Sequence, residues 1–149
     1  MTSHISVPLR RLVESRANGL CEYCLIHQTD TFFECQVDHI ISEKHGGPTD
    51  PDNLAYAYAI CNRAKGTDIG SIAPSTGQLT KFFDPRRDHW ADHFQLNGVL
   101  IEPRTPAGEV TVKILGFNET ERLLEREALR QIGRYPPKEA ARLVAAGQG

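Results

Sequence analysis

The fold depends on the stretch VDHIISEKHGGPTDPDNLAYAYAICNRAKG, at residues 37–66. A strand over residues 31–39 is expected to lead into it, because apolar residues alternate there at Phe33, Cys35 and Val37. The glycine- and proline-containing segment 43–49 predicts a loop. A helix is expected over residues 51–65, because an aspartate and a proline suit its start and a glycine follows it. The stretch thus predicts a strand, a loop and a helix in that order.

Three polar side chains in this stretch could carry out phosphodiester hydrolysis. That reaction needs a base that activates water and a cation that neutralises charge on the phosphate and the leaving oxygen. His39 can accept a proton at working pH and is the candidate general base. The adjacent Asp38 points to the other side of an extended chain and could bind a hard cation, with Asn62 as a neutral oxygen ligand. Mg²⁺ would keep its other positions for water and phosphate oxygens.

Neighbouring side chains could support this centre. Asn53 would lie in the first turn of the expected helix, where it can reach back to the loop after His39 and orient the base. Arg63 and Lys65 flank Asn62 and could hold a DNA backbone through phosphate contacts. Such contacts position a nucleic acid without reading its sequence.

The ordered set resembles the signature of the HNH endonuclease family. The segments that carry the resemblance lie between residues 19 and 66: Cys21-x-x-Cys24, Val37-Asp-His-Ile40, Gly46-Gly47, Asp52-Asn-Leu-Ala55 and Cys61-Asn-Arg-Ala-Lys-Gly66. The resemblance implies an α+β fold with a ββα-metal (His-Me finger) core. It also implies DNA cleavage with His39 as base, Asn53 orienting it, and a divalent ion on Asp38 and Asn62. The ion could be Mg²⁺ or another divalent metal such as Mn²⁺, Ni²⁺ or Zn²⁺.

The cysteines resemble a structural zinc site with one ligand missing. Many relatives carry two Cys-x-x-Cys pairs, and three cysteines match that pattern here: Cys21, Cys24 and Cys61. Tyr58 stands where the fourth would be. Because tetrahedral zinc needs four ligands, either Cys35 or His27 completes the site, or zinc has been lost and the cysteines pack as an apolar cluster.

Flanking segments predict further elements. Residues 7–18 should form a helix, because Ser6 suits its N-cap and Gly19 its C-terminal end. Residues 66–78 are rich in glycine, serine, threonine and proline and indicate a surface excursion. Residues 82–94 and the strands after them resemble a C-terminal extension of some bacterial HNH proteins.

The segment after residue 79 should contain a small sheet and helices. A hairpin is expected between residues 94–96 and 99–101 around Asn97-Gly98, and a strand over residues 109–115. Asn118 should cap a charged helix, and a short helix is expected over residues 137–146. The inner stripe of the charged helix should consist of Leu123, Leu124, Ala128 and Ile132.

Length, composition and net charge limit the class of protein to which these elements can belong. The chain has 149 residues, 40% of them hydrophobic, which suits one globular domain over residues 1–149. We expect a cytoplasmic protein, because no opening stretch resembles a signal peptide and no apolar run is long enough to cross a membrane. A net charge of −2 provides no global attraction to nucleic acid, so DNA contact must come from a local patch.

Two other functions fit parts of the pattern. A non-catalytic zinc-knuckle module that binds DNA or protein would explain the cysteines, but it does not require Asp38, His39 and Asn62 together. A nuclease used as a toxin is a second alternative, although the sequence contains no sign of it. His89 and His93 could share a helix face, but packing of the aromatic residues between and beside them favours a structural role.

Overall fold

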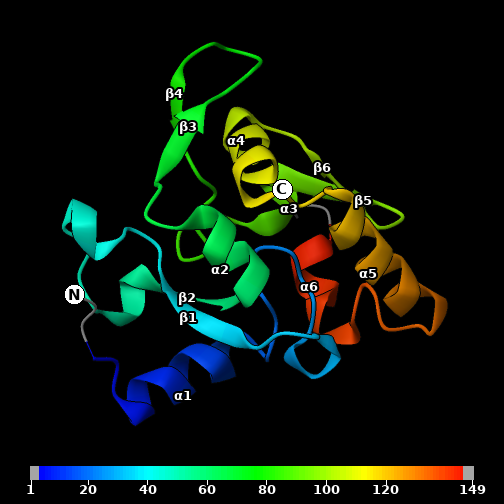
Figure 1. Ribbon diagram of the computed structural model, residues 1–149, viewed down its shortest axis with the longest axis horizontal. Helices are drawn as coiled ribbons and strands as arrows, with labels where there is room; N and C mark the ends of the chain where they lie inside the picture. The colour runs from blue at the N-terminus through cyan, green and yellow to red at the C-terminus, as the bar shows by residue number, and fades with distance from the viewer. Residues whose placement is uncertain (1–3, 146–149) are drawn as a thin grey trace.

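The computed structural model describes residues 4–145, which fold into helices and short antiparallel strand pairs (Figure 1). The elements in chain order are α1 (Val7–Arg16), β1 (Cys35–His39), β2 (Leu54–Tyr58), α2 (Ala59–Lys65), β3 (Gly70–Ile72), β4 (Leu79–Lys81), α3 (Trp90–His93), β5 (Phe94–Asn97), β6 (Leu100–Pro103), α4 (Pro106–Leu115), α5 (Thr120–Gln131) and α6 (Ala141–Val144). The strand pairs are β1–β2, β3–β4 and β5–β6. The expected α+β class is confirmed.

The helix predicted over residues 51–65 is wrong in its first half. A single 3-10 turn, Pro51–Asn53, leads into strand β2, which pairs antiparallel with β1 from Cys35 opposite Tyr58 to His39 opposite Leu54. The segment Leu54–Tyr58 alternates large and small apolar residues, and both of its faces are buried. Because this strand has no polar face, its sequence lacks the alternation of polar and apolar residues that usually identifies a strand.

Helix α1 covers one face of the β1–β2 pair. Its start is capped by Ser6, whose hydroxyl accepts a hydrogen bond from the Leu9 amide at 3.3 Å, as predicted. Val13 is fully buried against Leu54 and Tyr56 of β2. Arg16 donates to the carbonyl oxygens of Pro51 and Leu54 at 2.6 and 2.5 Å, which ties the helix to the start of β2.

In the C-terminal part of the chain, one predicted element is confirmed and others are wrong. The β5–β6 hairpin around Asn97-Gly98 is confirmed. Residues 109–115 form the end of helix α4 and not a strand, because Thr105 caps the helix through the Gly108 amide at 3.0 Å and Pro106 starts it. Residues 66–78 include β3 and lead to β4, so they are part of a hairpin and not only an excursion.

Helix α5 does not bury the predicted apolar stripe. Leu124 and Ile132 are 64% and 72% exposed, whereas Arg122 and Arg126 are buried. The arginines are tolerated inside because they donate to carbonyl oxygens and other acceptors there. Asn118 does not cap the helix: its side chain pairs with the backbone of Ile101 at 2.8 and 3.0 Å.

The last predicted helix, over residues 137–146, is present as the 3-10 turn Lys138–Ala140 followed by α6, and its expected final residue lies outside the described part of the chain. None of the helices within residues 4–145 is long and apolar enough to cross a membrane.

The segments before residue 66 and after residue 79 share the main hydrophobic core. Trp90 of α3 donates its indole N–H to the Tyr23 carbonyl at 2.9 Å, and the Tyr135 hydroxyl donates to the Cys24 carbonyl at 2.8 Å. Both donors come from the C-terminal part of the chain. Both acceptors belong to the segment 21–24, the cysteine-containing turn. The two parts of the chain are therefore joined by buried hydrogen bonds as well as by apolar contact.

Thr111→Val should lower the free energy of unfolding by about 1–3 kcal/mol, because an isosteric change leaves a buried amide without its acceptor. The Thr111 hydroxyl accepts from the Phe83 amide at 2.9 Å and donates to the Ala107 carbonyl at 2.7 Å inside α4. Urea unfolding of both proteins would measure the difference. Thr120→Val, at an exposed position, is the matched control, and equal losses in the two variants would contradict the prediction.

Candidate metal-dependent nuclease site

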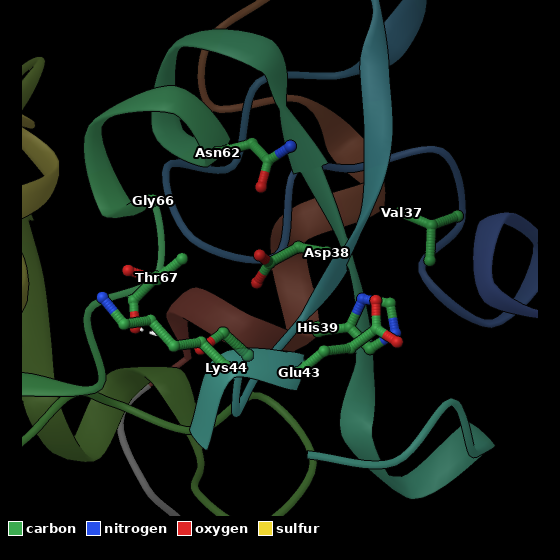
Figure 2. A pocket seen from close by; sticks show the side chains of 9 residues that line it. Val37, Asp38, His39, Glu43, Lys44, Asn62, Gly66 and Thr67 are labelled. Atoms are coloured by element: carbon green, nitrogen blue, oxygen red, sulfur yellow. Dashed lines mark hydrogen bonds between the residues drawn. The ribbon is translucent and has the colours of Figure 1, made fainter. Parts of the chain in front are cut away.

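A cleft of about 490 Å³ lies where β1, α2 and the turn after β1 meet (Figure 2). It is lined by Val37, Asp38, His39, Ser42, Glu43, Lys44, Asn62, Gly66 and Thr67. Three of the residues singled out in the sequence, Asp38, His39 and Asn62, are therefore brought together in one hollow. The pairing of β1 with β2 is responsible, because α2 follows β2 directly and packs beside β1.

Asp38 is almost fully buried, with 4% of its surface exposed. The Tyr23 hydroxyl donates to Oδ2 at 2.9 Å, and the Lys65 ammonium lies 3.2 Å from Oδ1. Burial raises the pKa of Asp38, and the Lys65 charge and the Tyr23 hydrogen bond act against that rise. A carboxylate oxygen has two lone-pair positions, so Oδ1 can still accept a cation in addition to its contact with Lys65.

Asn62 lies opposite this carboxylate on α2. Its amide nitrogen donates to the Gln36 side-chain oxygen at 2.7 Å, which leaves the amide oxygen for the cleft. Figure 2 shows that oxygen pointing toward the carboxylate of Asp38. A carboxylate and a neutral amide oxygen that face each other suit a hard divalent cation, with its other positions open to water or phosphate.

His39 continues β1 beyond Asp38 and lies at the edge of the same cleft. Its Nε2 lies 2.9 Å from the hydroxyl of Thr49. When Nε2 carries the proton and donates it to this hydroxyl, Nδ1 keeps a free lone pair and can act as a base. The contact with Thr49 occupies Nε2, so Nδ1 is the ring nitrogen that does not face this hydroxyl.

Asn53 fixes the loop that carries Thr49 and does not touch the His39 side chain in any of the contacts found. Its side chain accepts from the Ile41 amide at 2.9 Å and donates to the carbonyls of Ile41 and Pro48 at 2.9 and 2.8 Å. A Cβ at Gly47 would lie 1.7 Å from the Ile41 carbonyl oxygen, so only glycine permits the close approach. The expected reach of Asn53 to the loop after His39 is thus seen in the structure.

Of the two predicted phosphate contacts, only Arg63 is exposed. Lys65 is 1% exposed and binds Asp38 and the His39 carbonyl, at 2.9 Å for the latter, so its predicted role as a DNA contact is wrong. The reason is that Asp38 needs a counter-charge once β1 and α2 bury it. Lys44, which the sequence patterns did not single out, is exposed and lines the cleft.

Three cysteines form the one group of metal-binding side chains found within residues 4–145, with their ligand atoms within 4.8 Å of one another: Cys21, Cys24 and Cys61. All three are fully buried, and this group could hold a metal ion such as zinc. Neither Cys35 nor His27 joins it, so neither of the expected fourth ligands is in place. Tyr58 instead donates its hydroxyl to Glu125 at 2.8 Å.

Arg122 of α5 lies against the sulfur atoms. Its Nη2 donates to Cys61 Sγ at 2.9 Å. Burial opposes ionisation of the Cys24 thiol, but hydrogen bonds from Cys21 and Cys61 and the Arg122 charge lower the pKa of Cys24 well below its usual range. Burial raises the pKa of Cys21 and of Cys61.

His89 and His93 do not form a metal group with other side chains among the described residues. His93 Nδ1 lies 2.6 Å from the Thr105 hydroxyl, and His89 Nε2 lies 3.5 Å from the Ala145 carbonyl. Each histidine therefore contacts a different part of the C-terminal segment, in keeping with the structural role expected for them.

Some residues that shape the site carried no usable sequence signal. Tyr23 and Thr49 reach Asp38 and His39 through the tertiary fold, and nothing in the local pattern linked them. Gln36 was accessible to sequence reasoning, because residues two apart on a strand share a face and Asp38 follows it by two.

Comparison with known proteins gives one match. Residues 21–68 match the family model described as HNH endonuclease. No curated protein and no solved structure matches the chain. The matched residues contain the cysteine group, β1, β2 and α2, and so include the whole cleft described above.

Lys65→Met should lower the free energy of unfolding by about 3–5 kcal/mol near neutral pH, because it leaves the Asp38 carboxylate buried without a cation. A carboxyl whose pKa is higher in the folded than in the unfolded state stabilises the fold at low pH and loses that contribution as pH rises. Burial raises the pKa of Asp38, and Lys65 opposes the rise. The difference in free energy of unfolding between wild type and Lys65→Met should therefore shrink as pH falls.

Urea unfolding in EDTA at several pH values would measure this effect. The double variant Lys65→Met/Asp38→Asn should recover most of the loss, and Lys44→Met, at an exposed lysine of the same cleft, is the control. A Lys65→Met protein as stable as the wild type at neutral pH would show that the buried pair does not support the fold.

Proposed function

Because residues 21–68 of this chain form an HNH endonuclease domain, we propose that the protein is a metal-dependent endonuclease that hydrolyses phosphodiester bonds in DNA. The observation that carries the proposal is the convergence of His39, Asp38 and Asn62 on one cleft. A base beside two oxygen ligands for a divalent ion is a set of side chains that suits metal-assisted hydrolysis of a phosphodiester. We further propose that β1, β2 and α2 are a ββα-metal core and that residues 1–149 work as one unit.

His39 is the general base of the proposed reaction. We assign His39 the tautomer in which Nε2 donates to the Thr49 hydroxyl, 2.9 Å away. Its Nδ1 then takes a proton from a water molecule as that water attacks phosphorus and the bond from phosphorus to the leaving oxygen, on the opposite side, breaks. Asn53 acts indirectly, because it holds the loop from which Thr49 contacts the imidazole. It is a positioning residue and not a ligand.

Asp38 and Asn62 would hold the divalent ion. When bound, the ion supplies positive charge to the phosphate and to the leaving oxygen. Tyr23 and Lys65 keep the Asp38 side chain in a single orientation, and Gln36 does the same for the Asn62 amide. The donor atoms are all oxygen, which favours Mg²⁺ or Mn²⁺ over softer metals.

Arg63 and Lys44 are the cations that would contact the DNA backbone. Both are exposed, Arg63 next to Asn62 on α2 and Lys44 on the wall of the cleft. The chain has a net charge of −2, so these local charges have to provide the attraction.

Replacing His39 should abolish most of the cleavage without unfolding the protein. His39→Ala is expected to cut supercoiled plasmid in Mg²⁺ about 10²–10⁴-fold more slowly than wild type, which is the usual contribution of a general base. Cleavage rates and thermal unfolding midpoints would be measured on proteins purified side by side, with EDTA as a blank. His45→Ala, at an exposed histidine of the following turn, is the control and should cut normally.

If His39→Ala and wild type cut at the same rate, the observed activity would belong to a contaminant or to another site. A wild type that cuts in none of Mg²⁺, Mn²⁺, Ni²⁺ and Zn²⁺ but still binds DNA would favour the zinc-knuckle binding module instead.

Asn62→Ala should change the metal requirement of cleavage. Loss even of an outer partner of a metal ligand lowers affinity about 10–100-fold, so loss of a ligand should raise the half-saturating Mg²⁺ concentration at least about tenfold. Arg63→Ala, the next residue of the same helix, should instead raise KM for DNA and weaken its salt dependence. An unchanged Mg²⁺ requirement in Asn62→Ala would exclude Asn62 as a ligand.

A further inference from the structure

The β3–β4 hairpin turns its large apolar side chains away from the protein. Figure 1 shows the hairpin projecting beside α4. Ile72 and Leu79 are paired in the strand register, so both side chains lie on one face, here called the outer face, and they are 51% and 80% exposed. The side chains of the opposite face, Ser71 and Thr80, are half-buried, and both strands contact α4. A sheet packed on one side normally directs its apolar residues inward, so the outer face needs another explanation.

The hairpin is fixed in this orientation at both ends. At its base the Phe82 amide donates to the Ile69 carbonyl at 3.1 Å. At its tip the Ser75 amide donates to a carboxylate oxygen of Glu109, on α4, at 3.0 Å. The outer face is therefore a pre-formed surface, which a partner can cover without any change in the hairpin.

The charge of the hairpin suits a polyanion. Residues 69–83 contain one lysine and no aspartate or glutamate. Lys81 is exposed and lies on the outer face, because it follows Leu79 by two residues on β4. Lysine binds a phosphate backbone, and carboxylates repel it. The outer face thus combines an apolar pair with a cation.

A second group of exposed apolar side chains has the opposite surroundings. Phe32 and Phe33 are 86% and 45% exposed, and both line a hollow of about 480 Å³ together with Glu121 and Glu125 of α5. None of the ion pairs found within residues 4–145 includes either glutamate. A phosphate backbone would meet two carboxylates there, so this hollow does not suit DNA.

The hairpin follows the cleft directly in the chain. Thr67 lines the cleft, and Ile72 comes five residues later, at most about 18 Å away along an extended chain. That reach corresponds to about five nucleotides of a duplex strand, at about 3.4 Å each. Arg63 and Lys44, the cations proposed to contact the DNA backbone, lie at the same cleft. A duplex bound in the cleft would therefore extend far enough to meet the hairpin.

We propose that the β3–β4 hairpin is a DNA-binding arm: Ile72 and Leu79 enter a groove of duplex DNA, and Lys81 contacts a phosphate, while the cleft holds the strand to be cut. Leucine and isoleucine are among the side chains that proteins insert between base steps of a duplex. The inference rests on the proposed function and adds a substrate class to it. That class is duplex DNA, because a single strand has no groove to receive the apolar pair.

Binding of DNA to the full-length protein in EDTA tests the arm without cleavage. The probes are a short fluorescein-labelled duplex and one of its strands alone, titrated by fluorescence anisotropy at several salt concentrations. The double variant Ile72→Ser/Leu79→Ser should bind the duplex about 10–100-fold more weakly, the loss expected when a large apolar side chain is no longer buried. Its affinity for the single strand should not change.

Salt dependence separates the apolar contact from the phosphate contact. The double variant should keep the wild-type slope of log affinity against log salt, because no phosphate contact is removed. Lys81→Met should instead reduce that slope by about one. Phe32→Ser is the matched control: it removes an apolar side chain as exposed as Leu79 from acidic surroundings, and it should bind the duplex like wild type.

Wild-type duplex affinity in the double variant would overturn the proposal, as would an equal loss for the single strand or for Phe32→Ser. Light scattering after size-exclusion chromatography tests the other occupant, a second copy of the chain. A wild-type dimer that becomes a monomer in the double variant would show that the outer face joins two copies, and would also overturn the proposal.

Failure of the arm and failure of the reaction give different results. If the arm is wrong, plasmid cleavage still depends on His39, but the double variant binds the duplex like wild type. If the reaction is wrong, wild type cuts in no metal, and the double variant still loses duplex affinity. A wild type that binds no duplex would overturn both.

Discussion

The ion pair between Asp38 and Lys65 is the contact on which the geometry of the cleft depends. Asp38 lies on β1 and Lys65 at the end of α2, and the ammonium also binds the His39 carbonyl. Burial of two charges is tolerated only when each has a partner of opposite sign. The pair therefore holds α2 in one position on β1, and that position places Asn62 opposite the Asp38 carboxylate.

A second set of contacts starts from Asn53 and ends at the imidazole. Asn53 holds the backbone at Ile41 and Pro48, Gly47 permits the close approach between them, and Thr49 then meets His39 Nε2. Because the loop is fixed at both ends, the ring of His39 needs no direct contact with Asn53 to be oriented. The two sets of contacts explain why a short strand pair and a helix of two turns suffice for a defined site.

The C-terminal segment makes buried hydrogen bonds to the segment before residue 66, in addition to its apolar contacts. Trp90 and Tyr135 donate to carbonyls of the cysteine-containing turn, and Arg122 donates to Cys61. These polar contacts lie inside a core shared by both parts of the chain. Such buried donors restrict how the two parts of the chain can pack, since an arrangement that separated them from these carbonyls would leave them without acceptors.

The sequence alone determined the match of the central segment to the HNH endonuclease family, helix α1 and the β5–β6 hairpin, because ordered motifs, caps and turn residues act over a few neighbours. It also singled out Asp38, His39 and Asn62, whose roles in catalysis are part of the proposed function. Tertiary structure decided what local patterns could not. Leu54–Tyr58 became a strand because both faces are buried, and Glu109–Leu115 became helical despite its alternation. Lys65 and Arg122 look like surface cations in sequence, yet each is drawn inside by negative charge or sulfur on a distant segment. A charge is placed by its partner, and the partner is known only once the chain has folded.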